Sequence, residues 1–492
     1  MEKMRAPNDI HPLSSSSSSS STSLSARPSS WYSRKSWFVV IYELKLCEVM
    51  NFFSSFFSSF FSCLFLIPAR VSAIFFPFCE KQGKSTICDM SAKRQKVSEE
   101  DARGGDSLHV LGSVVFDILF SPKSLPTPGT TVLSKNVKKA PGGKGANQAY
   151  AAGKVLSSSS PTSSVSFFGC VGEDEFGAKS LESLQSVGVN TDHVQMRKEK
   201  ATAIASVVID EKGENQICVG SSANNSTNAK EWIEIVEKQK EKPAALLLQM
   251  EIPPSEVFAA VRYCSENGII SILNAAPADE SIPTETLEML NILIVNEHEV
   301  LQVRDSVLRE GYAMSIPRIY SNGNTDGPEL STDVVAQDPR AVAHQLAQSF
   351  QLIVIVTLGE EGCAAVSPVR PTENDASTGE ERDAIDTIYS SALKNLKSGE
   401  KIVSAVGAGD AFVGAFCAYL VEKRDIHTCL RAASACGTLA CLSNGARDGV
   451  PTRQDLDERM HDVELLGVWG KLGISEEALK CSAVDWCRLK KK

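Results

Sequence analysis

Residues 401–420 have the sequence "KIVSAVGAGDAFVGAFCAYL", in which small residues and one acid come directly before a long apolar segment. Apolar residues recur in that segment at helical spacing, at Phe412, Ala415, Phe416 and Leu420. The start of such a helix presents unpaired amide groups and the positive end of the helix dipole. Because Gly407, Ala408 and Gly409 are small, they leave these amides open to an anion. The stretch therefore predicts an anion-binding site at the start of a buried helix.

Asp410 falls in the first turn of this predicted helix, where two interpretations are open. In the first, the acid only complements the positive end of the helix dipole. In the second, its carboxylate takes a proton from a hydroxyl group, while the amides stabilise the charge on a transferring phosphoryl group. One carboxylate beside an anion site suits in-line phosphoryl transfer to an alcohol.

Residues 140–155 have the sequence "APGGKGANQAYAAGKV", a second glycine-rich motif ahead of a helical pattern. Its spacing matches neither the Walker A loop nor the dinucleotide-binding fingerprint. Gly142, Gly143 and Gly145 would allow the backbone to approach a ligand closely at the start of a helix. The alternative is a glycine-rich turn that only connects two elements.

The composition of the 492-residue chain, 42% hydrophobic and 22% charged, is that of a soluble globular protein. Its formal net charge of -10 argues against a nucleic-acid partner, because such proteins usually carry a basic surface. The 14 cysteines form no C-x-x-C pair and no Cys/His cluster at zinc spacing. They predict reduced thiols in a reducing compartment.

Residues 1–100 differ in composition from the rest of the chain. Ser14–Ser21 is an unbroken serine run, which predicts disorder, and no charged residue lies between Asn51 and Ala69. Three interpretations are open: a targeting segment that ends near "VSA" at residues 71–73, a membrane anchor, or translated upstream sequence with Met90 as the working start. We expect a cytoplasmic protein, or one imported into an organelle such as a plastid if the targeting segment is real.

Short aliphatic runs alternate with helical patterns from residue 106 onward. This alternation predicts βαβ units and a parallel sheet covered by helices on both faces. Leu108–Phe120 is typical of one buried strand, and Thr202–Gly220 is typical of a β-hairpin. Residues 301–350 and 368–399 are polar, and we expect them to be surface excursions with one helix each.

Polar residues follow several of the predicted strands. They are Glu251, Asn274, Asn296 with Glu299, and Thr357 with Gly359. Parallel sheets bind ligands in the crevice at the carboxyl ends of their strands. Four such positions in register predict a binding site at this edge of the sheet.

Together these motifs resemble the ribokinase branch of the PfkB carbohydrate kinase family. The resemblance covers roughly Leu108 to Pro451 and follows the family's order of blocks: "GSVVFD", "LPTPGTTV", "PGGKGANQA", "GCVGEDEFG", "GENQICVGSSANN", "QMEIP", "LNAAPA", "NEHE", "VTLGEEG" and "GAGDAFVGAF". It implies a ribokinase-like three-layer α/β sandwich with a parallel central sheet and a small β-strand lid. It also implies ATP as co-substrate, Mg²⁺ as cofactor and a homodimer formed through the lid.

The resemblance also implies roles for individual residues. Asp410 is similar to the catalytic base, and Gly407, Ala408 and Gly409 are similar to the anion hole. The sugar-binding positions of the family correspond to Asp117, Gly143, Lys144, Asn147 and Glu251. Asn296 and Glu299 match a motif near Mg²⁺ and the phosphates, with Glu299 acting on the metal indirectly. Nucleotide contacts are implied for Asn296, Thr357, Gly359 and Gly409.

Three positions depart from the family's pattern. Ser404, Ala405 and Val406 replace an Asp-Thr-x sequence whose acid helps to coordinate a monovalent cation, so a K⁺ site at Ser404 and Val406 is weakened. Val115 replaces an Asn that bonds the sugar, and a hydroxyl left facing it would cost about 1–3 kcal/mol. Ser434 replaces an Asn near the adenine.

The sequence thus predicts a kinase domain over residues 106–455, followed by a C-terminal extension over 456–492. The expected reaction is ATP-dependent phosphorylation of the primary hydroxyl of ribose. Two alternatives remain: a kinase of another sugar or a nucleoside, which Val115 favours, and a catalytically weak member with a binding or regulatory role, which Ser404 and Ser434 favour.

Overall fold

The computed structural model describes residues 106–156, 163–212, 214–278, 281–314, 337–368 and 385–466. All of them belong to one unit, which spans residues 95–492. Our expectations for residues 1–100, and for residues 467–492 of the predicted extension 456–492, fall outside the described residues. In the part of the chain that is described, no helix has the length and hydropathy needed to span a membrane.

A nine-stranded sheet forms the centre of this unit. Six neighbouring strands run parallel, and three antiparallel strands complete one edge. In sheet order the strands are β15 (Leu465–Leu466), β14 (Ile385–Ser390), β13 (Cys363–Pro368), β12 (Ile353–Thr357), β11 (Ile292–Asn296), β10 (Ile270–Asn274), β9 (Ala245–Gln249), β1 (Ser107–Leu111) and β4 (Ser164–Phe168). This confirms the predicted parallel sheet for six of the strands; the antiparallel edge formed by β13, β14 and β15 was not predicted.

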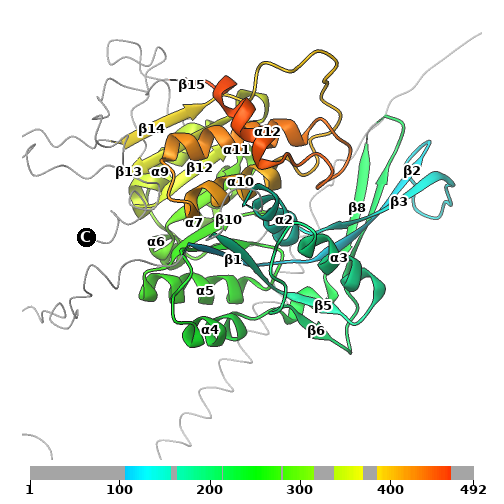
Figure 1. Ribbon diagram of the computed structural model, residues 1–492, viewed down its shortest axis with the longest axis horizontal. Coiled ribbons are helices and arrows are strands. Elements are labelled where there is room, and N and C mark those ends of the chain that lie inside the picture. The colour runs from blue at the N-terminus through cyan, green and yellow to red at the C-terminus, as the bar shows by residue number, and fades with distance from the viewer. Residues whose placement is uncertain are drawn as a thin grey trace, which may run out of the picture. The chain divides into compact units, whose positions relative to one another are not determined.

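Helices cover both faces of the sheet, as the alternation of patterns predicts (Figure 1). One face carries α2 (Lys144–Leu156), α3 (Glu175–Gln185), α10 (Ala408–Val421), α11 (Ile426–Ala440) and α12 (Arg453–Arg459). The other carries α4 (Ala229–Lys238), α5 (Pro254–Asn267), α6 (Thr284–Met289), α7 (Glu297–Arg309) and α9 (Pro339–Phe350). Short 3₁₀ turns lie at η1 (Ser222–Ser226), η2 (Gly359–Glu361) and η4 (Met460–Asp462).

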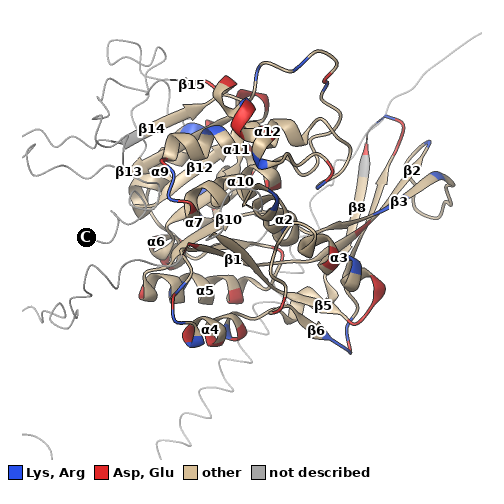
Figure 2. Ribbon diagram, in the orientation of Figure 1, with Lys and Arg blue, Asp and Glu red and all other residues tan. Residues whose placement is uncertain are grey.

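Side chains of the central strands alternate between two hydrophobic cores. On β9, Leu247 packs into the core beneath α10, whereas Leu246 and Leu248 pack into the core beneath α5. Successive strand residues point to opposite faces, so a strand that is buried on both faces needs an unbroken apolar run. Strands β9 to β12 accordingly contain no charged residue, whereas the solvent-facing helices α4 and α12 carry both signs (Figure 2).

A smaller four-stranded sheet projects from one end of the sandwich and forms the predicted lid (Figure 1). Its order is β3 (Ser134–Gly142), β2 (Val115–Pro122), β7 (Ala203–Ile209) and β8 (Asn215–Gly220). The antiparallel pair β7–β8 confirms the predicted hairpin. A two-stranded ribbon lies beside it, made of β5 (Cys170–Gly172) and β6 (Gln195–Arg197).

The prediction of one strand over Leu108–Phe120 is wrong, because the segment forms two strands in different sheets. β1 belongs to the central sheet and β2 to the lid, and the chain turns between them at residues 112–114. At this turn a Cβ atom on Gly112 would lie 2.1 Å from Oε1 of Gln249 and 2.9 Å from Cα of Gly145. The sequence pattern missed the break because Val110, Val114 and Val115 are all buried, so hydrophobicity continues across it.

The two polar excursions differ from each other. The first contains α9, as expected, and also most of α7, which runs on to Arg309. In the second, the described residues 385–399 contain strand β14 and no helix, so the prediction of a helix is wrong for that part. Strand β14 pairs with β13 and is therefore fixed by a long-range partner rather than by a local pattern.

Candidate active site

Helix α10 begins where the sequence predicts, with Gly407 as its N-cap. Gly407 has φ +81°, and a Cβ atom there would lie 2.5 Å from the backbone of Ala446, so glycine is required on both grounds. The Ala408 amide donates to the Ala405 carbonyl at 3.2 Å. Around Gly409, by contrast, a Cβ atom would meet nothing within 4 Å. At the predicted anion site, the open space therefore lies beside Gly409.

Asp410 lies in the first turn of α10 and is held by two side-chain amides from α2. The Nδ2 group of Asn147 donates to Oδ2 of Asp410 at 3.0 Å, and the Nε2 group of Gln148 donates to Oδ1 at 2.9 Å. Each carboxylate oxygen accepts one of these bonds. Asp410 is therefore an oriented carboxylate, and its position is set by more than the helix dipole.

Each of these two amides is itself oriented by a second side chain. Arg447 donates from Nε to Oδ1 of Asn147 at 2.8 Å, and Gln249 donates from Nε2 to Oε1 of Gln148 at 2.7 Å. Sequence reasoning missed three of these residues. Gln148 follows Asn147 in the glycine motif and Gln249 ends a predicted strand, so the sequence positions of both could have identified them as site residues. The sequence around Arg447 contains no such indication.

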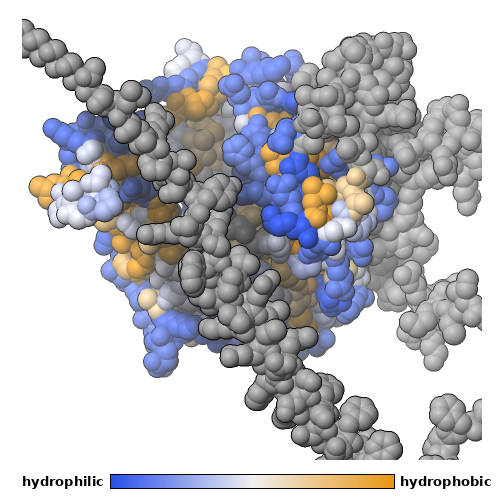
Figure 3. All heavy atoms as spheres, turned by 180° about the vertical axis from the view of Figure 1, so that it is seen from behind, coloured by the Kyte–Doolittle hydropathy of each residue, from blue (hydrophilic) through white to orange (hydrophobic). Residues whose placement is uncertain are grey.

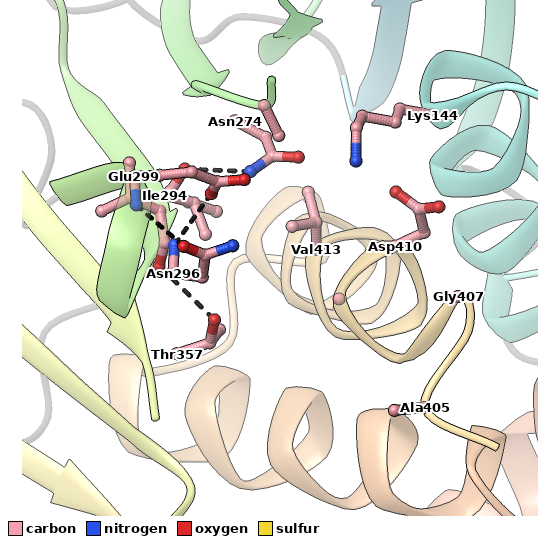
Figure 4. Close-up of a pocket in the computed structure, with 13 residues that line it drawn as sticks. Lys144, Asn274, Ile294, Asn296, Glu299, Thr357, Ala405, Gly407, Asp410 and Val413 are labelled. Carbon is pink, nitrogen blue, oxygen red and sulfur yellow. Dashed lines mark hydrogen bonds between the residues drawn. The ribbon is translucent and has the colours of Figure 1, made fainter. Parts of the chain in front are cut away.

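A cavity of about 220 Å³ opens beside Asp410 (Figure 4). Lys144 and Asp410 face one another from α2 and α10, and Asn274, Asn296 and Glu299 lie across the cavity from them. The cavity is lined by Lys144, Asn274, Ala276, Ile294, Val295, Asn296, Glu299, Thr357, Ala405, Gly407, Gly409, Asp410 and Val413. The predicted convergence of polar residues at the strand ends therefore holds for Asn274, Asn296, Glu299 and Thr357.

Two residues predicted for the same edge are not among those that line this cavity. Gly359 begins the 3₁₀ turn after β12 with φ +54°, and a Cβ atom there would meet nothing within 4 Å. Glu251 lies nearer the lid, where its Oε2 atom accepts bonds from Oγ of Ser113 at 2.6 Å and from the amide of Lys144 at 2.9 Å. Glu251 therefore contacts a residue that lines the cavity, the amide of Lys144, without lining the cavity itself.

Asn296 and Glu299 form the capping box of α7 at the cavity wall. The Glu299 carboxylate accepts the Asn296 amide at 2.9 Å, and Oδ1 of Asn296 accepts the amide of Glu299 at 2.8 Å. Burial raises the pKa of Glu299, although the Asn296 amide and the Lys144 ammonium act against it. Among the described residues, no group of three or more His, Cys, Asp or Glu side chains could hold a metal ion.

Mg²⁺ is commonly bound through one or two carboxylates together with substrate phosphates. The single carboxylate of Glu299 fits this donor set, whereas Oδ1 of Asn296 already accepts the amides of His298 and Glu299. A metal at this position would therefore take most of its ligands from the nucleotide phosphates.

The predicted sugar-binding residues gather where the lid meets the core. Asp117 lies on β2, and a Cβ atom on Gly142 would be 2.3 Å from its Oδ2 atom. Gly143 has φ +85°, and a Cβ atom there would be 2.6 Å from the amide nitrogen of Val115. This crowding explains why glycines occupy the turn before α2. The structure thus places Asp117 and Gly143 next to Lys144, Asn147 and Glu251.

The charges in this region influence one another. Burial raises the pKa of Asp117 to about 6; the Arg447 guanidinium acts against this rise, and the Glu251 and Asp410 carboxylates add to it. Burial acts to lower the pKa of Lys144, but nearby carboxylates, Asp410 first among them, outweigh it and raise that pKa. The site therefore holds several acids close to a buried cation.

At the predicted K⁺ site, the acid that is typical of the family is absent. Oγ of Ser404 accepts the amide of Val406 at 3.2 Å, and the amides of Val403 and Ser404 donate to the Cys441 carbonyl. No carboxylate replaces the missing acid at position 404. The side chains of Ser404 and Val406 therefore offer no anionic ligand to a monovalent cation.

The other two departures lie outside the cavity. Ser434 is buried, and its hydroxyl forms hydrogen bonds with Oγ of Ser390 at 3.1 Å and Sγ of Cys363 at 3.7 Å. Both of its partners therefore lie in the core beneath α11. Val115 is 5% exposed and packs with Ala203 and Ala205 at the base of the lid. The lid thus contributes an apolar patch beside Asp117.

Comparison with known proteins gives consistent matches. The model of the pfkB family carbohydrate kinases matches residues 106–453. Ribokinase of Bacillus subtilis is 30% identical over 350 residues, which cover 71% of this chain and 97% of that protein. Ribokinase of Schizosaccharomyces pombe is 28% identical over 352 residues, which cover 71% and 96%.

A solved structure, that of Arabidopsis thaliana ribokinase complexed with ribose and ATP, is 26% identical, with a TM-score of 0.56. The match covers 73% of this chain and 99% of that chain. The region matched by the family model contains both glycine motifs and most of the chain. The chain therefore belongs to the pfkB family of carbohydrate kinases and is an ATP-dependent phosphotransferase.

Proposed function

We propose that this chain transfers the γ-phosphate of ATP to the primary hydroxyl of ribose, converting D-ribose to D-ribose 5-phosphate. The observation that carries the proposal is the position of Asp410, which is held by two amides and lies on the cavity wall at the start of α10. The similarity to two ribokinases, and to a third complexed with ribose and ATP, supports ribose as the acceptor.

In this proposal the Asp410 carboxylate takes the proton of the acceptor hydroxyl. The hydroxyl oxygen attacks the γ-phosphorus and forms a new P–O bond. The bond from that phosphorus to the β–γ bridging oxygen breaks, and ADP leaves with its electron pair. The amides at Gly407 and Gly409 stabilise the charge that develops on the phosphoryl oxygens, and the Lys144 ammonium adds a positive charge beside them; the Ala408 amide already donates to the Ala405 carbonyl.

The phosphates of ATP are assigned to the cavity between α10 and the ends of β10 to β12. Asn296, Thr357, Gly359 and Gly409 are the proposed nucleotide contacts. Glu299 is the residue that would act on Mg²⁺, indirectly, and Mg²⁺ when bound would neutralise phosphate charge. These assignments rest on the convergence of three of the four nucleotide contacts, with Glu299, on one cavity.

The acceptor is assigned to the space between the lid and the core. Its hydroxyls would be bound by Asp117, Gly143, Lys144, Asn147 and Glu251. Carboxylates such as Asp117 and Glu251 accept hydrogen bonds from vicinal hydroxyls, which is why a polyol suits this space.

A second candidate acceptor is another sugar or a nucleoside. The observation that favours it is Val115, which is apolar and lies with Ala203 and Ala205 beside Asp117. A hydroxyl held against this patch would lack a partner, and burial without one costs about 1–3 kcal/mol. An acceptor without a hydroxyl at that point would avoid this cost.

We also propose that the protein is a homodimer formed through the lid. Ile217 and Val219 on β8 are 58% and 52% exposed. By strand register they share a face with Val207 on β7 and with Asp117 on β2, so an apolar row continues outward from the acceptor space. Apolar residues are visible at the lid surface in Figure 3, where the lid lies at the left. A second copy of the lid would cover this row.

The test is ADP formation by the purified chain with ATP, Mg²⁺ and a panel of ribose, 2-deoxyribose, other sugars and nucleosides. We expect ribose-dependent turnover, and a fall of about 10²- to 10⁴-fold in Asp410→Asn. Asp192→Asn, at an exposed aspartate outside the site, is the matched control. Turnover only with another acceptor would select the second candidate, and ATP binding without turnover on any acceptor would contradict both.

A further inference from the structure

Arg447 is a buried cation behind the proposed active site. It lies in the loop after α11 and is 6% exposed. Its guanidinium donates to Oδ1 of Asn147 at 2.8 Å, to Oγ of Ser183 at 2.9 Å and to the Gly142 carbonyl at 3.2 Å. One side chain thus connects α2, α3 and the glycine turn that precedes α2.

Its charge is retained despite this burial. Burial lowers the pKa of Arg447 to about 10, while Tyr150, Asp117 and Asp410 act to raise it. The guanidinium also lies over the ring of Tyr150, with Cζ 5.3 Å from the ring centroid. At neutral pH the group therefore remains protonated, and every nitrogen of the guanidinium remains a donor.

A guanidinium has donors and no acceptor, and this decides the orientation of its partner. An Asn side chain has an acceptor end and a donor end, and either could face α10. Because Arg447 requires the acceptor end of Asn147, the donor end must point toward Asp410, as it does at 3.0 Å. If the amide reversed, its oxygen would lie against a carboxylate oxygen, and that contact is repulsive.

The same loop also contacts the start of α10. The backbone of Ala446, next to Arg447, lies so close to Gly407 that a Cβ atom on Gly407 would be 2.5 Å away. The loop therefore packs against the N-cap of α10, while its arginine orients the amide that holds the first-turn acid. A displacement of this loop would be expected to affect both.

We propose that Arg447 is a positioning residue for phosphoryl transfer, acting through Asn147 to hold the Asp410 carboxylate in its reactive orientation. The inference rests on the proposed function, because it assumes that Asp410 is the base. Gln249 orients the second amide in the same way, through Gln148, but it is uncharged and lies at the end of a central strand. Arg447 alone adds a fixed positive charge near both Asp117 and Asp410.

The test is a double-mutant cycle on kcat with Arg447→Met and Asn147→Ala, each variant being checked by circular dichroism and thermal unfolding. We expect Arg447→Met alone to lower kcat by about 10- to 100-fold, with little change in KM for ATP, because small misplacements of a reacting group are costly. In the Asn147→Ala background the same substitution should change kcat by less than about threefold, because its route to Asp410 is already lost.

Two further variants separate positioning from folding. Arg447→Gln keeps a side-chain donor without the charge and should recover part of the kcat lost in Arg447→Met. Ser183→Ala removes a different Arg447 contact, on α3, and should leave kcat unchanged. If Arg447→Met does not fold, the cycle is run with Arg447→Gln.

Independent, multiplicative effects on kcat in the cycle would overturn the proposal. So would an Arg447 variant that loses thermal stability but keeps wild-type kcat. Failure of the proposed function has a different signature, namely a wild-type chain without turnover on any acceptor. In that case the crystal structure of the Arg447 variant tests only the effect of Arg447 on Asn147: an Asn147 side chain that keeps its place beside Asp410 would refute that effect, and a displaced side chain would support it.

Discussion

The Nδ2 group of Asn147 donates a 3.0 Å hydrogen bond to Oδ2 of Asp410, across 263 residues of chain. The two residues lie at the starts of α2 and α10, each directly after a glycine-rich segment. The bond joins the two motifs into one site, because the amide that would contact the acceptor also orients the acid that would deprotonate it. Phosphoryl transfer depends mainly on such positioning and on electrostatics, since the protein forms no covalent bond to the phosphoryl group.

Gln148→Met should lower both activity and stability. Gln148 is fully buried and bonds Asp410, Asn274 and Gln249, so an apolar isostere leaves buried polar groups unpaired. We expect a loss of about 1–3 kcal/mol in the free energy of unfolding, measured in urea, and a fall in kcat of about tenfold. Gln345→Met, at a buried glutamine on α9, should leave kcat unchanged. Unchanged kcat in Gln148→Met would show that the second amide is dispensable.

Asp117→Asn should change the pH dependence of stability. Burial raises the folded-state pKa of Asp117 from 3.8 to about 6. The folded state therefore binds the proton more tightly than the unfolded state. The stability this provides is complete below the unfolded pKa and is lost as pH rises through the folded pKa. The Asn variant does not titrate at this position and so does not lose this stability. Its free energy of unfolding, relative to that of the wild type, should therefore rise by about 1–2 kcal/mol between about pH 5 and pH 8.

The measurement is the difference in free energy of unfolding between the variant and the wild type, because this difference cancels the other titrating groups. The same variant should raise KM for the acceptor, since Asp117 is assigned to acceptor binding. A stability difference that stays constant with pH would mean that Asp117 is not buried in the way the structure places it.

Monovalent cations should have little effect on this enzyme. Ser404 supplies no carboxylate, and its hydroxyl already accepts the amide of Val406. Replacing K⁺ by tetramethylammonium at constant ionic strength should change kcat by less than about twofold. Ser404→Asp is the matched comparison, since it returns an acid to that position and should introduce a response to K⁺. Strong K⁺ activation of the wild type would show that backbone carbonyls alone can hold the ion.

Ile217→Asp should convert the proposed dimer to a monomer. Ile217 lies in the exposed apolar row of the lid, where an acid would be buried without a partner in a lid-to-lid interface. Val137→Asp is the matched control, because Val137 is similarly exposed, at 54%, but pairs with Phe120 and so lies on the opposite face of the lid. Light scattering after size exclusion gives the molar mass. A wild-type monomer, or a dimer unaffected by Ile217→Asp, would exclude this interface.

Local pattern was enough for most of the fold. Aliphatic runs such as Ala244–Met250 and Leu352–Gly359 became central strands, and the small residues before Asp410 became a helix start. The hydrophobic pattern missed the turn at Gly112, because buried residues continue on both sides of it while the chain changes direction. It also missed strand β14, which is stabilised by pairing with β13. Hydrophobic periodicity reports which side chains are buried, but it does not report which sheet or partner buries them.

The family motifs, the alternation of strands and helices, and the acid at the start of α10 can all be recognised in the amino-acid sequence. How that acid is held depends on contacts between distant segments of the folded chain. Arg447 reaches Asn147 across 300 residues, and Gln249 reaches Gln148 across 101. Neither contact can be predicted from the spacing of residues in the sequence, because the direction of each hydrogen bond depends on how α2 packs against α10 and the neighbouring loop. Local sequence specifies local conformation, whereas the orientation of a buried amide is set by the donor that the fold brings beside it.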